Sequence, residues 1–272
     1  MLMRMLSVVA FTTSIGLAQE PAKPKGGEPP GEPKARQDSR APLGEMRKIE
    51  VRGNTYDWYV AEGRGDAKQK PGLIVIQEWW GLNDWIKGNA DHFAKLGYTA
   101  VAVDLYHGKV ASDPDLAHEL MRGLPEDQAL TDLRAAVTSL WENPNIDRVR
   151  IGCIGWCMGG GYALKIAVAD PRVTACVMCY GAPITDAEQL KSLNASLLGI
   201  FGQEDRGISV ESVEKFKAAL KKAGIKHSIH VFPEVGHAFM NPNNVKGYNA
   251  NWAKEAWKHI DEFLDAALRP SP

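Results

Sequence analysis

The sequence has few cysteines, no excess of either charge, and no long apolar run after its first residues. Its 272 residues contain four cysteines, and 32 lysines and arginines are balanced by 33 aspartates and glutamates, for a formal net charge of -1. Proteins that bind nucleic acids or anionic membranes generally carry a basic excess, so neither partner is expected. After the N-terminus, no apolar stretch reaches the roughly 20 residues that a membrane-spanning helix needs.

Metal-binding patterns are also missing. The seven histidines include no H-x-x-x-H pair, so we expect no metal and no cofactor. Cys176 and Cys179 have the spacing C-x-x-C, but they lie in an apolar run predicted to be a strand, where residues three apart point to opposite faces. We therefore expect both to pack in the core. A disulfide between Cys153 and a neighbouring strand stays open, because an exported protein can form one.

The N-terminus differs from the rest of the chain. "MLMRMLSVVAFTTSIGLAQE" has one arginine, then an apolar run, then the small-x-small ending Gly16-Leu17-Ala18. This layout predicts a signal peptide over 1–18 and export to a periplasm or out of the cell. An uncleaved anchor is the alternative, but the run is short for a membrane span. Residues 19–45, rich in proline, glycine and charge, are predicted to be a flexible linker.

From Met46 the sequence alternates apolar runs with helical patterns. "GLIVIQEWWG" (72–81) contains a continuous apolar run, typical of a strand covered on both faces. The alternation predicts an α/β domain over 46–269, with a mainly parallel sheet and helices on both faces. We expect strands at 56–63, 72–81, 98–106, 149–155, 172–180, 196–201 and 226–232, and helices at 84–98, 126–141, 158–169, 209–223 and 249–268. Ligands bind such sheets at the carboxyl ends of the strands.

One strand end carries a candidate nucleophile. In "IGCIGWCMGGG" an apolar strand meets the turn Gly155-Trp156-Cys157-Met158-Gly159, which has the form G-x-nucleophile-x-G. Such a turn exposes its central side chain at a helix N-terminus, and small residues two positions away let the strand and helix approach each other. The helix dipole and free N–H groups there favour a thiolate. The alternative is a buried structural cysteine, which would not need glycines on both sides.

A cysteine nucleophile needs a base and a group that orients the base. His237, in "FPEVGHAFMNP", lies in the last loop before the C-terminal helix. Glu204 and Asp205 follow the strand 196–201, and we favour Asp205 as the orienting acid. Cys157, Asp205 and His237 then follow three strands in the chain order nucleophile, acid, histidine.

At this point the sequence resembles the dienelactone hydrolase family over roughly 46–269. The segments that carry the resemblance are "IQEWWGLND", "VAVDLYHG", "IGWCMGG", "FGQEDRGIS" and "FPEVGHAF". The resemblance implies an α/β-hydrolase fold and a triad of Cys157, His237 and Asp205. It also implies that Glu78 restrains the resting thiol and helps to move its proton.

Further site residues follow from this arrangement. The oxyanion hole would be the backbone N–H groups of Met158 and Trp79. Classical members bind a substrate carboxylate with arginines, but one such position is Asn241 here, so dienelactone itself is not supported as the substrate. The candidate pocket residues are Trp80, Trp156, His107 and Asn241, with Trp85 nearby. Trp79 and Trp80, being adjacent, are expected to point in opposite directions.

We therefore expect a hydrolase that cleaves a small carboxylic ester or lactone through an acyl-thioester intermediate. Two other classes stay open. The fold could serve a non-catalytic binding module, or Cys157 could act as a thiol-redox sensor, which would need a resolving cysteine nearby. The physiological substrate and the oligomeric state do not follow from the sequence.

Overall fold

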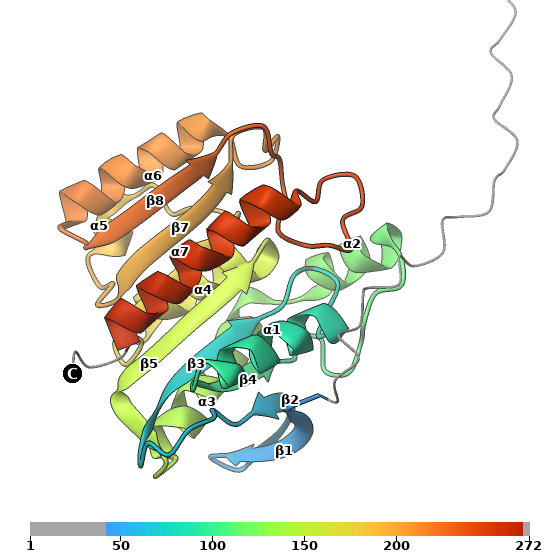
Figure 1. Ribbon diagram of the computed structural model, residues 1–272, viewed down its shortest axis with the longest axis vertical. Coiled ribbons are helices and arrows are strands. Elements are labelled where there is room, and N and C mark those ends of the chain that lie inside the picture. Colours follow the sequence, from blue (N-terminus) through green and yellow to red (C-terminus); the bar gives the residue numbers. More distant parts are fainter. Residues whose placement is uncertain (1–41, 269–272) are drawn as a thin grey trace, which may run out of the picture. The chain divides into compact units, whose positions relative to one another are not determined.

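The computed structural model describes residues 42–268, which form an eight-stranded sheet between two layers of helices (Figure 1). The spatial strand order is β1-β2-β4-β3-β5-β6-β7-β8. The first two pairings, β1 with β2 and β2 with β4, are antiparallel, and all the others are parallel. The strands are β1 (Glu45–Val51), β2 (Asn54–Ala61), β3 (Lys70–Ile76), β4 (Thr99–Val103), β5 (Ile146–Trp156), β6 (Ala175–Cys179), β7 (Ser196–Gly202) and β8 (His227–Phe232). The predicted α/β-hydrolase fold, with a mainly parallel sheet, is confirmed.

Two core layers hold the helices on the sheet. One layer lies between the sheet and the helices α3, α4, α5 and α6, and the other lies under α1 and α7. The inner strands are apolar throughout because both of their faces are covered; every residue of β4 and β6 is buried. The helices are α1 (Asp84–Lys95), α2 (Pro114–Gly123), α3 (Glu126–Glu142), α4 (Met158–Ala169), α5 (Ala187–Leu190), α6 (Val210–Ala223) and α7 (Ala250–Leu268).

The helices begin and end where local chemistry dictates. The side chain of Asn83 accepts a hydrogen bond from the N–H of Ile86 and so caps α1, and Ser209 caps α6 in the same way. Gly224 ends α6 with a φ of 74°, a left-handed conformation in which glycine is free of strain. These caps place α1 and α6 within a few residues of their predicted bounds.

The structure contains three elements that the sequence patterns did not predict. They are the edge strand β1, the helix α2 and the single turn of α5. In β1 the burial alternates and most side chains are exposed, so its apolar pattern is weak. Only Ala117 of α2 is buried, which explains why the segment around His118 reads as polar and irregular. Each element lacks the broad apolar face that makes an element visible in a sequence.

The predicted signal peptide 1–18 and nearly all of the predicted linker 19–45 lie outside the described residues. The first described residues already belong to the domain, because the N–H groups of Leu43 and Gly44 donate to the carboxylate of Asp91 at 3.0 Å. No helix within residues 42–268 combines the length and apolarity needed to cross a bilayer.

Candidate active site

The turn after β5 holds Cys157 in a conformation that exposes it at the start of α4. Its φ and ψ are 55° and -120°, and its N–H donates to the carbonyl oxygen of Cys179 at 3.0 Å. A non-glycine residue with positive φ is strained, and such strain is common where a side chain is held for chemistry. Because α4 begins at the next residue, Cys157 lies at the positive end of the helix dipole.

The flanking glycines are required by contact with neighbouring backbone. A Cβ on Gly155 would lie 2.1 Å from the carbonyl oxygen of Gly159. A Cβ on Gly159 would lie 2.3 Å from the carbonyl oxygen of Gln77, in the segment after β3. Both distances are far inside van der Waals contact, so no larger residue fits without moving α4 from the sheet. The predicted reason for the two glycines is confirmed.

His237 and Asp205 form a hydrogen-bonded pair. The Nδ1–H of His237 donates to Oδ2 of Asp205 at 2.7 Å, with the tautomer assigned from that contact. The other carboxylate oxygen of Asp205 accepts the N–H groups of Gly207 at 2.8 Å and Ile208 at 3.0 Å. Asp205 is buried and Glu204 is exposed, so the alternative acid is not the partner of His237. With Nδ1 engaged, Nε2 of His237 is left for a second partner.

The second partner of His237 is Cys157. Burial lowers the pKa of His237, but hydrogen bonds with Asp205 and Cys157, together with the negative charges of both, raise it to about 10. Burial raises the pKa of Asp205, but the hydrogen bonds from His237, Ile208 and Gly207 outweigh burial and lower it below its usual value. With its pKa raised to about 10, His237 is an imidazolium near neutral pH, and it lies between the Asp205 carboxylate and the Cys157 sulfur.

Glu78 lies fully buried just beyond the end of β3. Its Oε2 accepts a hydrogen bond from the side-chain amide of Asn241 at 2.6 Å, and its Oε1 accepts one from the hydroxyl of Tyr180 at 3.4 Å. Burial raises the pKa of Glu78 to about 7, and these two hydrogen bonds and the charge of His237 only partly offset it. A carboxyl with this pKa exchanges its proton near neutrality.

The two backbone N–H groups predicted to bind an oxyanion belong to Met158 and Trp79. Met158 is the first residue of α4, where an N–H has no acceptor within the helix, and Trp79 follows Glu78. Neither N–H has an acceptor within the described part of the chain. The hydroxyl of Tyr106 contacts both residues: it lies 3.1 Å from the carbonyl oxygen of Trp79 and 3.4 Å from Sδ of Met158.

Tyr106 and Tyr180 are site residues that the sequence reasoning missed. Tyr106 lies three residues past β4, and Tyr180 directly follows β6 with a φ of 40°. The Tyr180 ring also packs on His237, with centroids 5.2 Å apart. The rule that chemistry lies just past the strands could have found both, because each follows a buried parallel strand.

Trp156 does not line a pocket, contrary to expectation. It ends β5, where its side chain points into the core layer under α1 and α7 and is fully buried. Its ring packs between Trp85, at a centroid distance of 5.3 Å, and Trp257, at 5.8 Å. Successive side chains along a strand point to opposite faces, so Trp156, the last residue of β5, points inward while the next residue, Cys157, is exposed in the turn.

The remaining candidates lie in distinct surroundings. The rings of Trp79 and Trp80 meet edge to face 5.1 Å apart, so the prediction that they point in opposite directions is wrong, because they lie in a turn rather than a strand. His107 is half-exposed and its Nε2 lies 2.8 Å from the carboxylate of Asp132 on α3, whereas His237 is paired with Asp205. Asn241 is buried and binds Glu78.

The other cysteines are buried free thiols. Cys176 and Cys179 lie in opposite core layers, as their spacing in a strand predicted. Cys153 lies beside Cys176 on the neighbouring strand, and Sγ of Cys153 donates to the carbonyl oxygen of Ala163 at 3.3 Å. Among the residues described, no group of three or more potential ligand side chains could hold a metal ion.

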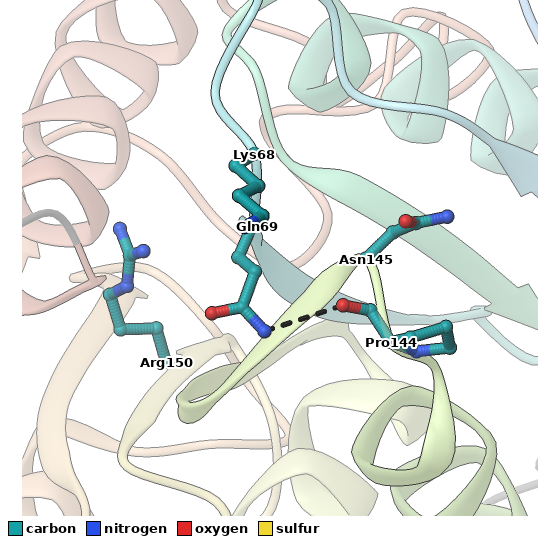
Figure 2. A pocket seen from close by; sticks show the side chains of 5 residues that line it. All are labelled: Lys68, Gln69, Pro144, Asn145 and Arg150. Atoms are coloured by element: carbon teal, nitrogen blue, oxygen red, sulfur yellow. Dashed lines mark hydrogen bonds between the residues drawn. The ribbon is translucent and has the colours of Figure 1, made fainter.

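A surface hollow elsewhere on the domain is not part of this site. Figure 2 shows the side chains that line it, which are Lys68, Gln69, Pro144, Asn145 and Arg150. It lies near the amino-terminal ends of β3 and β5, where Lys70 pairs with Ile146. Cys157 follows the carboxyl end of β5, so the two features occupy opposite edges of the sheet.

Comparison with known proteins gives a consistent result. The model of the family described as "Dienelactone hydrolase family" matches residues 57–268. A protein of Methylorubrum extorquens named "Putative carboxymethylenebutenolidase" is 32% identical over 208 residues, which cover 71% of each chain. A protein of the same name from Escherichia coli K12 is 31% identical over 79% of this chain and 84% of its own.

The solved structures agree with this. The crystal structure titled as a "Putative Dienelactone Hydrolase" from Klebsiella pneumoniae superposes with a TM-score of 0.74 at 27% sequence identity. The match covers 83% of this chain and 99% of the Klebsiella chain. The similarity therefore spans nearly the whole of the Klebsiella chain, and the range matched by the family model includes Glu78, Cys157, Asp205 and His237.

Proposed function

The chain belongs to the dienelactone hydrolase family, and we propose that it hydrolyses a small carboxylic ester or lactone with Cys157 as the nucleophile. The observation that carries the proposal is the placement of Cys157 on a strained turn beside the His237–Asp205 pair. In that pair, Nδ1 of His237 lies 2.7 Å from Oδ2 of Asp205. The names of the relatives support an ester or lactone as the substrate class.

In the first half of the reaction, the Cys157 sulfur attacks the carbonyl carbon of the substrate. The N–H groups of Met158 and Trp79 donate to the oxyanion that forms. When the tetrahedral intermediate collapses, the bond to the leaving oxygen breaks, and Nε2 of His237 gives that oxygen a proton. The products of this half are an alcohol, or the opened chain of a lactone, and an acyl thioester on Cys157.

In the second half, water replaces the alcohol. Neutral His237 takes a proton from a water molecule as the water attacks the thioester carbonyl. The carbon–sulfur bond then breaks and the carboxylic acid leaves. Asp205 stabilises the imidazolium in both halves and fixes the tautomer that presents Nε2 to the substrate. Its two backbone hydrogen bonds keep its carboxylate from rotating away from His237.

Glu78 adjusts the charge near the thiol. When it is ionised, its negative charge opposes that of the Cys157 thiolate, and when it is protonated it does not. A pKa of about 7, raised by burial, lets it change between these states near neutral pH. We propose that it restrains the resting thiol in this way and accepts a proton when substrate enters.

The first test measures hydrolysis of p-nitrophenyl acetate by the purified chain before and after treatment with iodoacetamide. We expect turnover to fall in step with alkylation of Cys157, mapped by mass spectrometry. The variants Cys157→Ala and His237→Gln should lose turnover and keep the native circular dichroism spectrum. His227→Gln is the matched control, because His227 lies at the start of β8 and its Nδ1 contacts the carbonyl oxygen of Ile225. Turnover that survives full alkylation of Cys157 would refute the proposal.

The two alternative functions predict different outcomes. A binding module would hold an ester without releasing p-nitrophenol. A redox sensor would form a disulfide between Cys157 and a resolving thiol after treatment with hydrogen peroxide. Cys179, on the neighbouring strand, is poorly suited to that role, because burial raises its pKa well above the usual value and keeps it a thiol.

We also propose that the protein is exported with cleavage after Ala18. The support is the sequence pattern of residues 1–18. N-terminal sequencing of the protein recovered from the medium or a periplasmic extract is expected to begin at Gln19. A chain that stays in the cytoplasm with its first residues intact would contradict this.

A further inference from the structure

The charges around Cys157 are mainly negative. Glu78 and Asp205 both place buried carboxyl groups at the site, and Cys157 adds a third negative charge when it is a thiolate. His237 is the basic group among them. Within residues 42–268, no lysine or arginine contributes to the pKa of Glu78, Asp205 or His237. One imidazolium therefore faces two or three negative charges.

The hydrogen-bond partners of Glu78 add no positive charge. Both oxygens of Glu78 are held by neutral donors, the amide of Asn241 at 2.6 Å and the hydroxyl of Tyr180 at 3.4 Å. Because Glu78 is fully buried, water screens its charge poorly. An anionic group of a substrate close to this carboxyl would find the His237 imidazolium already paired with Asp205, and it would be repelled whenever Glu78 is ionised.

The other side chains around the thiol are aromatic or apolar. The Tyr106 hydroxyl lies 3.4 Å from Sδ of Met158, and the negative charge of Cys157 raises the pKa of Tyr106 after burial, so this phenol lies near the thiol. The Tyr180 ring packs on His237, and Cys157 itself packs against a cluster of apolar side chains. These surfaces suit an apolar acyl group, which gains contact area without losing hydrogen bonds to water.

We propose that the substrates of this enzyme carry an uncharged, apolar acyl group, and that the site rejects acyl groups that bear a carboxylate. The inference rests on the proposed ester hydrolysis and specifies its substrate class. The preference for uncharged acyl groups follows from the excess of acidic side chains at the site and from the uncharged hydrogen-bond partners of Glu78. Asn241 is then a specificity-determining residue, because it satisfies Glu78 without supplying a charge.

A matched pair of esters tests this. The p-nitrophenyl ester of valeric acid and the mono-p-nitrophenyl ester of glutaric acid have acyl chains of equal length and differ only in a terminal methyl or carboxylate. After subtraction of the hydrolysis without protein, we expect kcat/KM at pH 8 to be at least tenfold higher for valerate. Equal values, or a preference for glutarate, would overturn the inference.

Two variants locate the cause of the discrimination. Glu78→Gln keeps the shape and removes the charge, so the valerate-to-glutarate ratio should fall severalfold whatever happens to the overall rate. Val149→Arg is the control, since Val149 is 70% exposed in the amino-terminal half of β5, whose other end leads to Cys157, and an arginine there adds a cation away from the site. Its ratio should match that of the unaltered chain. A ratio that is unchanged in Glu78→Gln would refute the assignment of the effect to Glu78.

A second readout does not depend on ester turnover. Iodoacetamide and iodoacetate alkylate the same sulfur, and they differ in charge. We expect the rate ratio of iodoacetamide to iodoacetate to be higher for Cys157 than for glutathione under the same conditions. If no ester is hydrolysed but this ratio is high, the proposed function fails and the charge selectivity stands. If esters are hydrolysed and the ratio is equal to or below that of glutathione, the function stands and the selectivity fails.

Discussion

The glycine at the start of α4 offers a sharp test of how the site is built. In Gly159→Ala, the new Cβ would lie 2.3 Å from the carbonyl oxygen of Gln77, whereas ordinary contacts begin at about 3.4 Å. The helix must move away from β3 by roughly 1 Å to relieve the clash. Forcing an extra carbon into a packed site costs about 1–3 kcal/mol. For a domain of this size, each kcal/mol lowers Tm by about 2–4 °C.

The same displacement moves the proposed nucleophile. Cys157 directly precedes α4, so a shift of the helix carries its sulfur and the N–H of Met158 out of line with His237. A misplacement of about 1 Å in a reacting group costs on the order of 100-fold in rate. We therefore expect Gly159→Ala to fold with a Tm lower by about 2–12 °C and to lose most of its kcat on p-nitrophenyl acetate.

The control for this variant is Gly88→Ala. Gly88 lies on the exposed face of α1, and a Cβ there would meet no atom within 4 Å. Alanine is a better helix former than glycine by about 1 kcal/mol, so Tm should rise slightly while kcat stays unchanged. Thermal unfolding followed by circular dichroism, with kcat from the same preparations, checks both. If Gly159→Ala matched Gly88→Ala in Tm and kcat, the contact-based reasoning would be refuted.

Three further predictions concern the charges and hydrogen bonds of the site. Burial raises the pKa of Glu78 from 4.5 to about 7, so as the pH rises the folded state loses this proton at a higher pH than the unfolded state does. The free energy of unfolding should therefore fall by about 3 kcal/mol from pH 4 to pH 8, relative to the variant Glu78→Gln. Urea titrations of both proteins at the two pH values measure this difference. Asp205→Asn removes a partner that raises the pKa of His237, so NMR should show the imidazole titrating at a lower pH. The kcat of this variant should fall about 10- to 150-fold. An unchanged titration of His237 would contradict the pairing. Tyr106→Phe removes the hydroxyl that donates to the Trp79 carbonyl oxygen, so kcat should fall about 2- to 10-fold with KM unchanged. A change in KM alone would instead assign Tyr106 to substrate binding.

The success and failure of the structural predictions have physical causes. The buried strands and amphipathic helices were predicted because each has an apolar face that must be buried, and the spacing of apolar residues along the chain shows that face. The edge strand β1 and the helix α2 bury few side chains, so their patterns resemble those of loops. Trp79 and Trp80 were misjudged because a period of two was applied to residues that lie in a turn.

Glu78 was proposed from the resemblance to the family, and Cys157, Asp205 and His237 were proposed together from the sequence alone. Chain order determined this, since residues that follow successive parallel strands must meet at one edge of the sheet. The need for glycine on both sides of the proposed nucleophile was also predicted from the sequence, because the close approach of neighbouring backbone excludes every larger residue.

The tertiary structure decided what the sequence left open. It chose Asp205 over Glu204 by burying one carboxylate against His237 and leaving the other in solvent. It placed Trp156 in the core, and it joined Glu78 to Asn241, a residue 163 positions away. Burial and long-range hydrogen bonding depend on which segments pack together, and a local pattern does not contain that information. The neutral hydrogen-bond partners of Glu78, on which the proposed substrate class rests, belong to this second group.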